Sequence, residues 1–166
     1  MAHQFVVTSL DLSSDRSSFA CGTAPLDKYF QTQVSQDIKR RVTACFVASD
    51  VHGKIAGYYT LASASVLLSD LPEALIKKLP RYPSVPAVRM GRLAVDQTFK
   101  GKGLGAALLA DALRRAVTSE IAAYAFIVDA KDEDAASFYA HHGFIAFTNH
   151  PLHMFITLAT VKDLIL

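Results

Sequence analysis

The sequence predicts an α+β or α/β fold in which helices flank one mixed β-sheet. Short runs rich in Val, Ile, Phe and Tyr alternate with segments whose apolar residues recur near the helical period of 3.6 residues. The second half of the chain repeats the order strand, helix, strand, helix, which favours this class. Hydrophobic residues make up 51% of the 166 residues and charged residues 19%, enough apolar side chains for a buried core. No internal repeat or Gly/Ser-rich linker divides the chain, so we expect a single domain over residues 1–166.

The first half is predicted to contain a helix and a β-hairpin. Residues 24–39 carry apolar side chains at helical spacing. Two apolar runs, 43–49 and 54–68, are joined through a short polar stretch with a glycine, which is the pattern of a β-hairpin. We expect a first strand over residues 5–10 before the helix, and a short helix over residues 69–78 after the hairpin.

The second half begins with a proline-rich segment and continues with regular elements. Three prolines within residues 79–88 predict an irregular loop. On the helix that follows, Asp111 and two arginines lie outside the apolar stripe, so we expect them to face away from the core. The elements expected after the loop are a strand over 88–96, a helix over 103–119, a strand from Tyr124 that ends before Lys131, a short helix over 132–143 and a closing strand over 152–161.

Several classes of protein are excluded by the composition. The two cysteines, Cys21 and Cys45, are too few for a disulfide framework or a four-cysteine metal site, and we expect both to be packed in the core. His141 and His142 are adjacent and do not share a helix face, so no metal is expected. The N-terminus lacks a secretion signal, and the longest weakly polar run, 55–68, is too short to span a bilayer. These features predict a cytoplasmic protein without membrane association.

The stretch Lys100-Gly-Lys-Gly-Leu-Gly105 connects a predicted strand to a predicted helix. Glycines let the backbone come close to a ligand, and the amides at a helix start bind anions. Lys100 and Lys102 add positive charge, so the loop predicts a phosphate site rather than an ordinary glycine-rich turn.

Two other loop patterns also bind phosphate in proteins. The P-loop pattern G-x-x-x-x-G-K-[ST] is absent. Gly101, Gly103 and Ala106 fit G-x-G-x-x-A, which keeps a dinucleotide-binding fold open as an alternative. Against it, four residues separate the strand from Gly101, and only 61 residues follow Gly105.

The loop resembles the [Q/R]-x-x-G-x-[G/A] motif of the GNAT superfamily of acyl-CoA N-acyltransferases, in which loop amides hold the pyrophosphate of coenzyme A. Lys100 stands where Gln or Arg is usual; lysine keeps the positive charge but lacks the planar fork. The resemblance implies a GNAT-like sheet, mixed and mostly antiparallel, whose splayed central strands hold acyl-CoA. It also implies acetyl-CoA as co-substrate.

Four further blocks, within about residues 19–158, resemble the GNAT toxins of bacterial toxin–antitoxin pairs. The blocks are Phe19-x-Cys21-Gly22-x-x-x-Leu26-Asp27-x-x-Phe30, Gly57-Tyr-Tyr-Thr-Leu-Ala62, Arg92-Leu-Ala-Val-Asp96 and Phe138-Tyr139-x-His141-His142-Gly143-Phe144. Those toxins acetylate the α-amino group of aminoacyl-tRNA and so block translation. The resemblance implies an N-acetyltransferase with an aminoacyl-tRNA substrate, a ribbon-helix-helix antitoxin as partner, and homodimer formation.

The resemblance also assigns roles to individual residues. It implies that Tyr139 is the general acid that protonates the departing thiolate, although on the residues alone Tyr139 can also be a core aromatic beside Phe138 and Phe144. A backbone N–H of the strand before the loop would polarise the acetyl carbonyl. The residues expected to bind the cofactor are Leu93, Ala94, Val95, Lys100, Gly101, Lys102, Gly103, Leu104, Gly105, Ala106 and Phe138.

Positive charge is concentrated between residues 77 and 115, which hold nine of the 17 basic residues and only two acids. Such an excess favours a polyanionic ligand, and phosphate contacts supply much of the affinity for nucleic acid. A solvated surface is the alternative, and Arg92 can instead pair with Asp96. Two other functions stay open, a small-molecule or protein N-acetyltransferase and an inactive acyl-CoA-binding module. The residues expected to contact tRNA are Lys77, Lys78, Arg81, Arg89 and Arg92.

Overall fold

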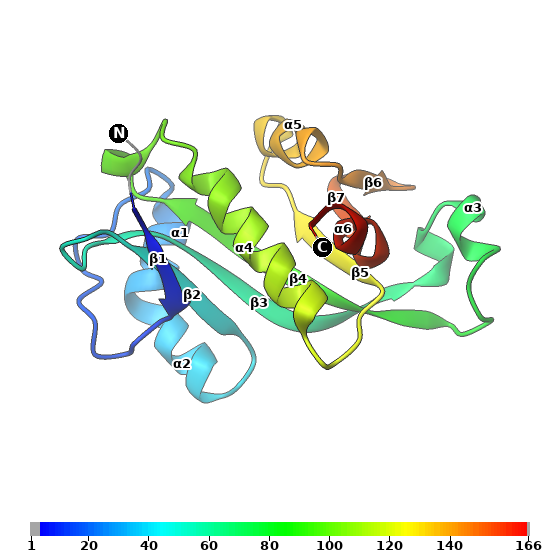
Figure 1. The fold of residues 1–166 in the computed structure, drawn as a ribbon, viewed down its shortest axis with the longest axis horizontal. Helices are drawn as coiled ribbons and strands as arrows, with labels where there is room; N and C mark the ends of the chain where they lie inside the picture. Colours follow the sequence, from blue (N-terminus) through cyan, green and yellow to red (C-terminus); the bar gives the residue numbers. More distant parts are fainter. Residues whose placement is uncertain (1–3, 166) are drawn as a thin grey trace. The chain divides into compact units, whose positions relative to one another are not determined.

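The computed structural model describes residues 4–165 of the chain (Figure 1). Its strands are β1 (Val6–Ser9), β2 (Ala44–Ser49), β3 (Ile55–Leu67), β4 (Ser84–Val95), β5 (Ala125–Asp129), β6 (Ile145–Phe147) and β7 (His150–Thr157). Its α-helices are α1 (Ala24–Lys28), α2 (Val34–Lys39), α3 (Glu73–Ile76), α4 (Leu104–Thr118), α5 (Glu133–His141) and α6 (Leu158–Ile165). A π-helical turn, η1 (Tyr29–Gln33), joins α1 to α2, and two 3-10 turns are η2 (Leu68–Asp70) and η3 (Gln97–Phe99).

The strands form one seven-stranded sheet in the order β1-β2-β3-β4-β5-β7-β6. β4 and β5 run parallel, with Ala87 opposite Ala125 and Met90 opposite Val128. The pairs β1–β2, β2–β3, β5–β7 and β6–β7 are antiparallel. The expected sheet, mixed and mostly antiparallel, is therefore confirmed.

The described chain divides into two compact units. The first comprises residues up to Ala62 together with Gly91–Ala112, and the second comprises Ser63–Met90 together with the residues from Leu113 onward. The long elements β3, β4 and α4 contribute residues to both units. No described helix is long and apolar enough to cross a membrane.

In the first unit, the neighbouring tyrosines of β3 pack on opposite faces of the sheet. The Tyr58 ring stacks on Phe30 at 4.3 Å, and its hydroxyl donates to the Leu26 carbonyl. Tyr59 stacks on Phe46 and its hydroxyl donates to Asp111 Oδ2 on α4 at 2.5 Å. The expectation that Asp111 faces away from the core is therefore wrong, because its carboxylate accepts a hydrogen bond from the hydroxyl of a fully buried tyrosine.

The predicted hairpin and helix of the first unit are both present. In the β2–β3 turn, the Asp50 carboxylate accepts from the amides of His52 and Lys54, and Gly53 has φ +79°. The helix predicted over residues 24–39 spans those bounds, but its middle turn is the π-helical η1. In this π-helical turn the Phe30 carbonyl accepts a hydrogen bond from Arg16 Nε at 2.9 Å. A side-chain donor therefore bonds to the helix backbone at the point where its pitch changes.

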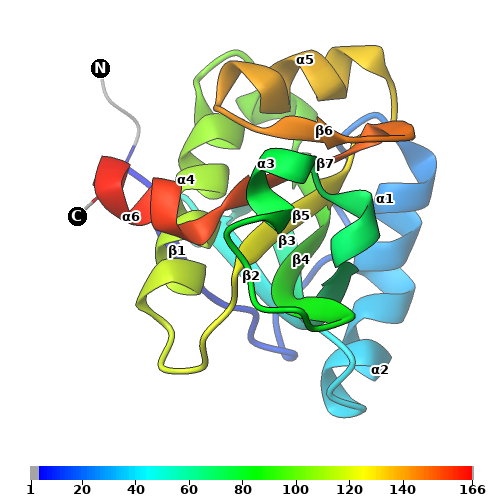
Figure 2. The ribbon, with the colours of Figure 1, turned by 90° about the vertical axis from the view of Figure 1, so that its right-hand side faces the viewer.

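The second unit is built on β5, which lies between β4 and β7 in the sheet. The inward side chains Val66, Val85, Ile127 and Phe155 form its core. α5 packs against β7, and β6 pairs with β7 in the same unit (Figure 2). Gly143 follows α5 with φ +95°, the left-handed conformation in which glycine commonly ends a helix.

Two expectations, for the proline-rich segment and for the helix before it, need correction. The helix expected over residues 69–78 is split into η2 and α3 because Pro72 keeps the preceding Leu71 extended, at ψ 155°. Residues 79–88 are not all irregular, since β4 already begins at Ser84. Pro86 fits this strand because it is exposed and its carbonyl accepts from the Tyr124 amide at 2.8 Å.

The C-terminal elements also differ from the expected strand over residues 152–161. β7 ends at Thr157, whose hydroxyl pairs with that of Thr160 at 2.7 Å and caps the start of α6. Leu158 and Val161, three residues apart, are both buried, which is helical spacing. β6, only three residues long, was not predicted from the sequence.

Candidate active site

The turn that leads into the glycine loop is fixed by Asp96, which is 3% exposed. Its carboxylate accepts from the Ala20 amide at 3.1 Å, the Thr98 amide at 3.0 Å and the Thr98 hydroxyl at 2.7 Å. Burial opposes ionisation, but these hydrogen bonds outweigh it and hold the pKa of Asp96 below its ordinary value. The Asp96 carboxylate is therefore ionised and holds the turn in place, and it does not pair with Arg92.

The Lys100 side chain has a different environment from the one expected. Its ammonium donates to the Cys21 carbonyl at 2.5 Å and lies close to Gly22, where φ is +94°. A Cβ at Gly22 would stand 2.7 Å from the Gln97 side chain, so the backbone at residue 22 approaches the turn as closely as only glycine allows. Lys100 thus joins the segment around Cys21 to the turn, a role the sequence did not reveal.

The glycines of the loop leave their backbone open. Gly101 and Gly103 both have φ +78°, and no described residue beyond the glycine and its two chain neighbours has a heavy atom within 4 Å of the point where a Cβ would stand. The Ala107 amide donates to the Gly103 carbonyl, so α4 begins at this loop (Figure 1). The first amides of a helix have no acceptor within the helix and carry its positive dipole end. Open backbone, free amides and a nearby Lys102 fit the pyrophosphate of acetyl-CoA.

The strand before this loop is held closely against β3. A Cβ on Gly57 would stand 2.9 Å from the Ala94 carbonyl oxygen and 2.8 Å from Leu108 Cδ1. The amide of Asp96 donates to the Ala56 carbonyl at 2.8 Å. Gly57 therefore sets the position of the backbone at Leu93–Val95, the stretch expected to meet the acetyl carbonyl.

Tyr139 is a buried phenol on α5. The helix is capped by Asp132, whose carboxylate accepts from the Ala135 amide at 2.8 Å. The ring is 8% exposed and lies against Phe138 and Phe144, with centroids 5.3 Å and 5.5 Å away. Burial, with a smaller contribution from the Asp129 carboxylate, raises the pKa of Tyr139 to about 12. The phenol is therefore protonated at neutral pH, as a proton donor must be.

The basic residues expected to contact tRNA fall into two groups. Lys77, Lys78 and Arg81 are exposed on and after α3, and Arg89 lies 3.6 Å from Asp129. Arg92 is half-buried, with its guanidinium carbon 3.3 Å from the centroid of the Tyr29 ring. Arg92 therefore makes a cation–π contact and does not stand free in solvent.

The predicted site residues belong to both compact units. The first unit contains Leu93–Val95, residues 100–106 and Arg92, and the second contains Phe138, Tyr139 and the other basic residues. Within the second unit, sequence reasoning missed the contact of Asp129 with His153, from Oδ1 to Nδ1 at 2.6 Å. The signal that could have identified it is a charged residue at the carboxyl end of a buried strand.

The two cysteines are packed in the core, as expected. Cys21 and Cys45 are buried, and burial raises the pKa of both thiols, that of Cys45 to about 12. Neither thiol is therefore poised as a nucleophile. Across residues 4–165, no group of three or more His, Cys, Asp or Glu side chains could hold a metal ion.

Comparison with known proteins identifies the family. A family model described as "Acetyltransferase (GNAT) domain" matches residues 20–156. A "tRNA-acetylating toxin" of Mycobacterium tuberculosis is 34% identical over 155 residues, covering 92% of each chain. The solved structure of AtaT complexed with acetyl-methionyl-tRNAfMet matches with a TM-score of 0.90 at 26% identity, covering 98% of this chain and all of that one. A crystal structure of AtaTR bound with AcCoA matches with a TM-score of 0.85 at 25% identity, covering 98% of both chains.

These matches remove the dinucleotide-binding alternative, because they cover nearly the whole chain with one other fold. They also agree with the expected GNAT-like fold and with acetyl-CoA as the co-substrate. The chain belongs to the GNAT family of acetyltransferases, enzymes that use acetyl-CoA.

Proposed function

We propose that this enzyme transfers the acetyl group of acetyl-CoA to the α-amino group of an aminoacyl-tRNA and acts as a translation-blocking toxin. The observation that carries the proposal is the similarity, over almost the entire chain, to a relative named as a tRNA-acetylating toxin. A neighbour in fold that was solved with an acetylated aminoacyl-tRNA supports the same acceptor.

The glycine loop supplies the site for the co-substrate. The open amides at Gly101 and Gly103, together with the amide of Gly105 in the first turn of α4, would hold the pyrophosphate of acetyl-CoA. Lys102 would add a full charge, whereas the Lys100 ammonium is already bonded to the Cys21 carbonyl. Leu104, Ala106 and Phe138 complete the proposed cofactor contacts.

The transfer needs a neutral amine, a polarised carbonyl and a proton for the departing thiolate. An α-amino group has an ordinary pKa of about 7.7–8.0, so a useful fraction is neutral near pH 7. A backbone N–H within Leu93–Val95 would stabilise the oxyanion as the amine nitrogen attacks the thioester carbon. The Tyr139 phenol would then give its proton to the sulfur as the carbon–sulfur bond breaks.

We also propose how the enzyme binds tRNA, where it acts and which proteins it binds. Exposed basic residues on and after α3 would bind tRNA phosphates. The chain would act in the cytoplasm as one acetyltransferase domain over residues 1–166 and would form a homodimer. A ribbon-helix-helix antitoxin would neutralise it, in keeping with the toxin class of its relatives.

The test offers the enzyme labelled acetyl-CoA together with charged tRNAs, the same tRNAs without amino acid, polyamines, aminoglycosides and peptides. We expect label on charged tRNA alone, and its release with the amino acid when the ester bond is hydrolysed at alkaline pH. If label is transferred only to a small amine or a peptide and charged tRNA stays unlabelled, the proposed toxin function is wrong and the protein is a small-molecule or protein N-acetyltransferase.

A further inference from the structure

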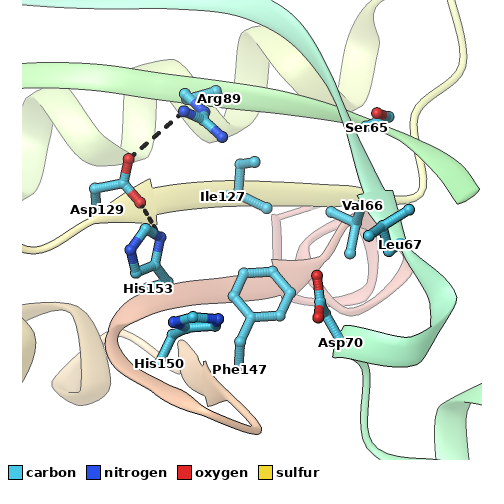
Figure 3. Close-up of a pocket in the computed structure, with 10 residues that line it drawn as sticks. All are labelled: Ser65, Val66, Leu67, Asp70, Arg89, Ile127, Asp129, Phe147, His150 and His153. Carbon is cyan, nitrogen blue, oxygen red and sulfur yellow. Dashed lines mark ion pairs between the residues drawn. The ribbon is translucent and has the colours of Figure 1, made fainter.

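A cavity of about 290 Å³ opens between strands of the second unit (Figure 3). One end is polar and contains Arg89, Asp129 and His153, and the middle is formed by Ile127 and Phe147. The volume lies just below the range for small-molecule sites, about 300–1,000 Å³. It therefore suits a group of amino-acid size better than a whole cofactor.

The polar end has the arrangement of a carboxylate that orients a histidine. Asp129 Oδ1 lies 2.6 Å from His153 Nδ1, and Oδ2 lies 3.6 Å from Arg89 Nη1 (Figure 3). A hydrogen on Nδ1 that points to the carboxylate leaves the lone pair of the neutral ring on Nε2. Within the described chain, His153 Nε2 has no hydrogen-bond partner, and 54% of the side chain is exposed, so a ligand can reach this nitrogen.

The balance of charge in the cavity favours an amine over an anion. Two carboxylates, Asp70 and Asp129, line it against one guanidinium, that of Arg89. Arg89 is already paired with Asp129, so the net charge of these three groups stays negative. An ammonium group gains from this field, whereas a phosphate or carboxylate does not.

The middle of the cavity is apolar and held by packing. Ile127 is 5% exposed, and the Phe147 ring stacks on Phe155 at 4.8 Å. Figure 3 places Ile127 and Phe147 between the polar end and Asp70. An apolar side chain attached to the same carbon as the amine can lie on this surface while the amine stays near Asp129.

The cavity and the proposed general acid belong to one unit and to consecutive elements. Asp129 is the last residue of β5, and α5, which carries Tyr139, begins four positions later at Glu133. The Asp129 carboxylate also contributes to the raised pKa of Tyr139.

We propose that this cavity is the acceptor pocket for the aminoacyl group, with His153, held by Asp129, as the base that takes the proton of the α-amine. The side chain of the amino acid lies on Ile127 and Phe147, so the preferred acceptors are tRNAs charged with apolar amino acids. This inference rests on the proposed acetylation of aminoacyl-tRNA and names the residues that receive its acceptor.

The proton transfers then balance. His153 Nε2 takes a proton from the bound α-ammonium group, and the neutral amine nitrogen then forms a bond to the thioester carbon and becomes positively charged. The carbon–sulfur bond breaks, and the thiolate takes the phenolic proton of Tyr139. The phenolate regains a proton from the nitrogen as the amide forms, so the products are the N-acetyl amide, free coenzyme A and a protonated His153, which returns to neutrality by exchange with water.

The first test is the pH profile of His153→Gln, measured as kcat/KM for a charged tRNA. We expect a loss of about 10–100-fold at pH 6.5, where most of the α-amine is protonated, and a loss below about 3-fold at pH 8.5, where the amine is neutral without help. The charged and titratable groups around His153 are Asp129 on β5, Arg89 on β4, His150 on β7 and Asp70 after β3. Asp129→Asn should give the same profile, because it removes the partner that fixes the ring.

His52→Gln is the matched control, because His52 lies in the β2–β3 turn and outside this cavity. A loss in His153→Gln that is equal at both pH values, or no larger than in His52→Gln, would overturn the role as base. Circular dichroism and acetyl-CoA affinity, both expected to be unchanged, separate this role from a structural one.

The second test fills the pocket from its exposed rim. Ser65 is exposed on β3 and lines the cavity, whereas Ser69 is exposed and does not line it. Ser65→Trp should raise KM for leucyl-tRNA at least about 10-fold and that for glycyl-tRNA by less, since glycine has no side chain to place. Ser69→Trp should leave both values unchanged.

The outcomes separate the pocket from the proposed function. If the wild type labels no charged tRNA, the proposed function fails and the acceptor assignment fails with it. If the wild type labels charged tRNA but Ser65→Trp affects glycyl-tRNA and leucyl-tRNA equally, the proposed function stands and the pocket is wrong.

Discussion

The carboxylate of Asp96 accepts a hydrogen bond from the Ala20 amide at 3.1 Å, across 76 positions of the chain. The Gln97 amide donates to the Ala20 carbonyl at 2.8 Å, and the Lys100 ammonium donates to the Cys21 carbonyl. The segment before α1 therefore holds the turn that presents the glycine loop. Two sequence blocks that resemble the toxins, around Cys21 and around Asp96, are explained by this one contact region.

The first prediction concerns the stability that Asp96 provides. Asp96→Asn should lower the free energy of unfolding at pH 7 by about 2–4 kcal/mol, because hydrogen bonds to a buried carboxylate are lost or weakened. Urea unfolding measures the loss. Asp163→Asn, an exposed change on α6, should have no measurable effect.

The same substitution predicts a pH dependence with a definite sign. The pKa of Asp96 is lowered from its ordinary value of 3.8 in the folded protein. Its contribution is therefore fully present above the unfolded pKa and is lost as the pH falls through the lower, folded value. The difference between wild type and Asp96→Asn should shrink below about pH 4; a constant difference down to pH 2 would contradict the assignment.

The sequence predicts most of this fold because its apolar spacing is regular. The hairpin of β2 and β3, the helix α4 and the cap at Gly143 follow from local patterns that tertiary contacts do not override. Residues 158–161, the start of α6, are predicted as strand because their apolar residues continue a short apolar run, in which strand and helix spacing are hard to separate.

The candidate site was predictable only where local chemistry marks it. Alternating glycines before a helix indicate an anion site in any context. The contacts of Asp111 with Tyr59 and of Asp129 with His153 join distant segments, and nothing near each residue specifies its partner. The sequence therefore shows which residue types are present, whereas the partner of each side chain becomes known only from the folded sheet.

The second prediction tests the close approach of β3 to the strand before the loop. Gly57→Ala should destabilise the protein by about 1–3 kcal/mol, because its Cβ would meet the Ala94 carbonyl at 2.9 Å. It should also lower kcat by displacing the backbone proposed to polarise the acetyl group. Gly91→Ala is the control, since its Cβ would meet only the Thr60 hydroxyl, at 3.3 Å. Equal kcat values for the two variants would show that Gly57 does not position this strand for catalysis.

The third prediction concerns acetyl-CoA binding by the glycine loop. Gly103→Asp should abolish binding in calorimetry, because a carboxylate would enter a site built for phosphate. Gly53→Asp is a close match, with φ +79° against +78° and open space around the Cβ position in both cases. The two variants therefore share the backbone strain of a left-handed residue and differ in the anion site. Retained acetyl-CoA affinity in folded Gly103→Asp would place the pyrophosphate elsewhere.

The fourth prediction concerns the proton donor. Tyr139→Phe removes the hydroxyl and keeps the ring, and should lower kcat by about 10²–10⁴-fold with unchanged acetyl-CoA affinity. Because the pKa of Tyr139 is raised to about 12, ionisation of this phenol should not reduce the wild-type rate below about pH 10. Tyr124→Phe, a change at a half-buried tyrosine of the same unit, is the control. Similar turnover in both variants would assign the proton to water or to another group.

The last prediction concerns the basic residues on and after α3. Lys77, Lys78 and Arg81 are exposed, and phosphate contacts made by such side chains release counterions from nucleic acid. The double substitution Lys77→Glu with Lys78→Glu should raise KM for charged tRNA and leave the affinity for acetyl-CoA unchanged. The wild-type KM should rise steeply between about 50 and 200 mM salt, and less steeply in the double variant, because fewer counterions are released on binding. Lys162→Glu, an exposed change on α6, reverses a charge in the same unit and should leave both the KM and its salt dependence as they are. If Lys162→Glu and the double variant shift the salt dependence equally, the net charge of the protein attracts tRNA and the α3 residues make no specific phosphate contacts.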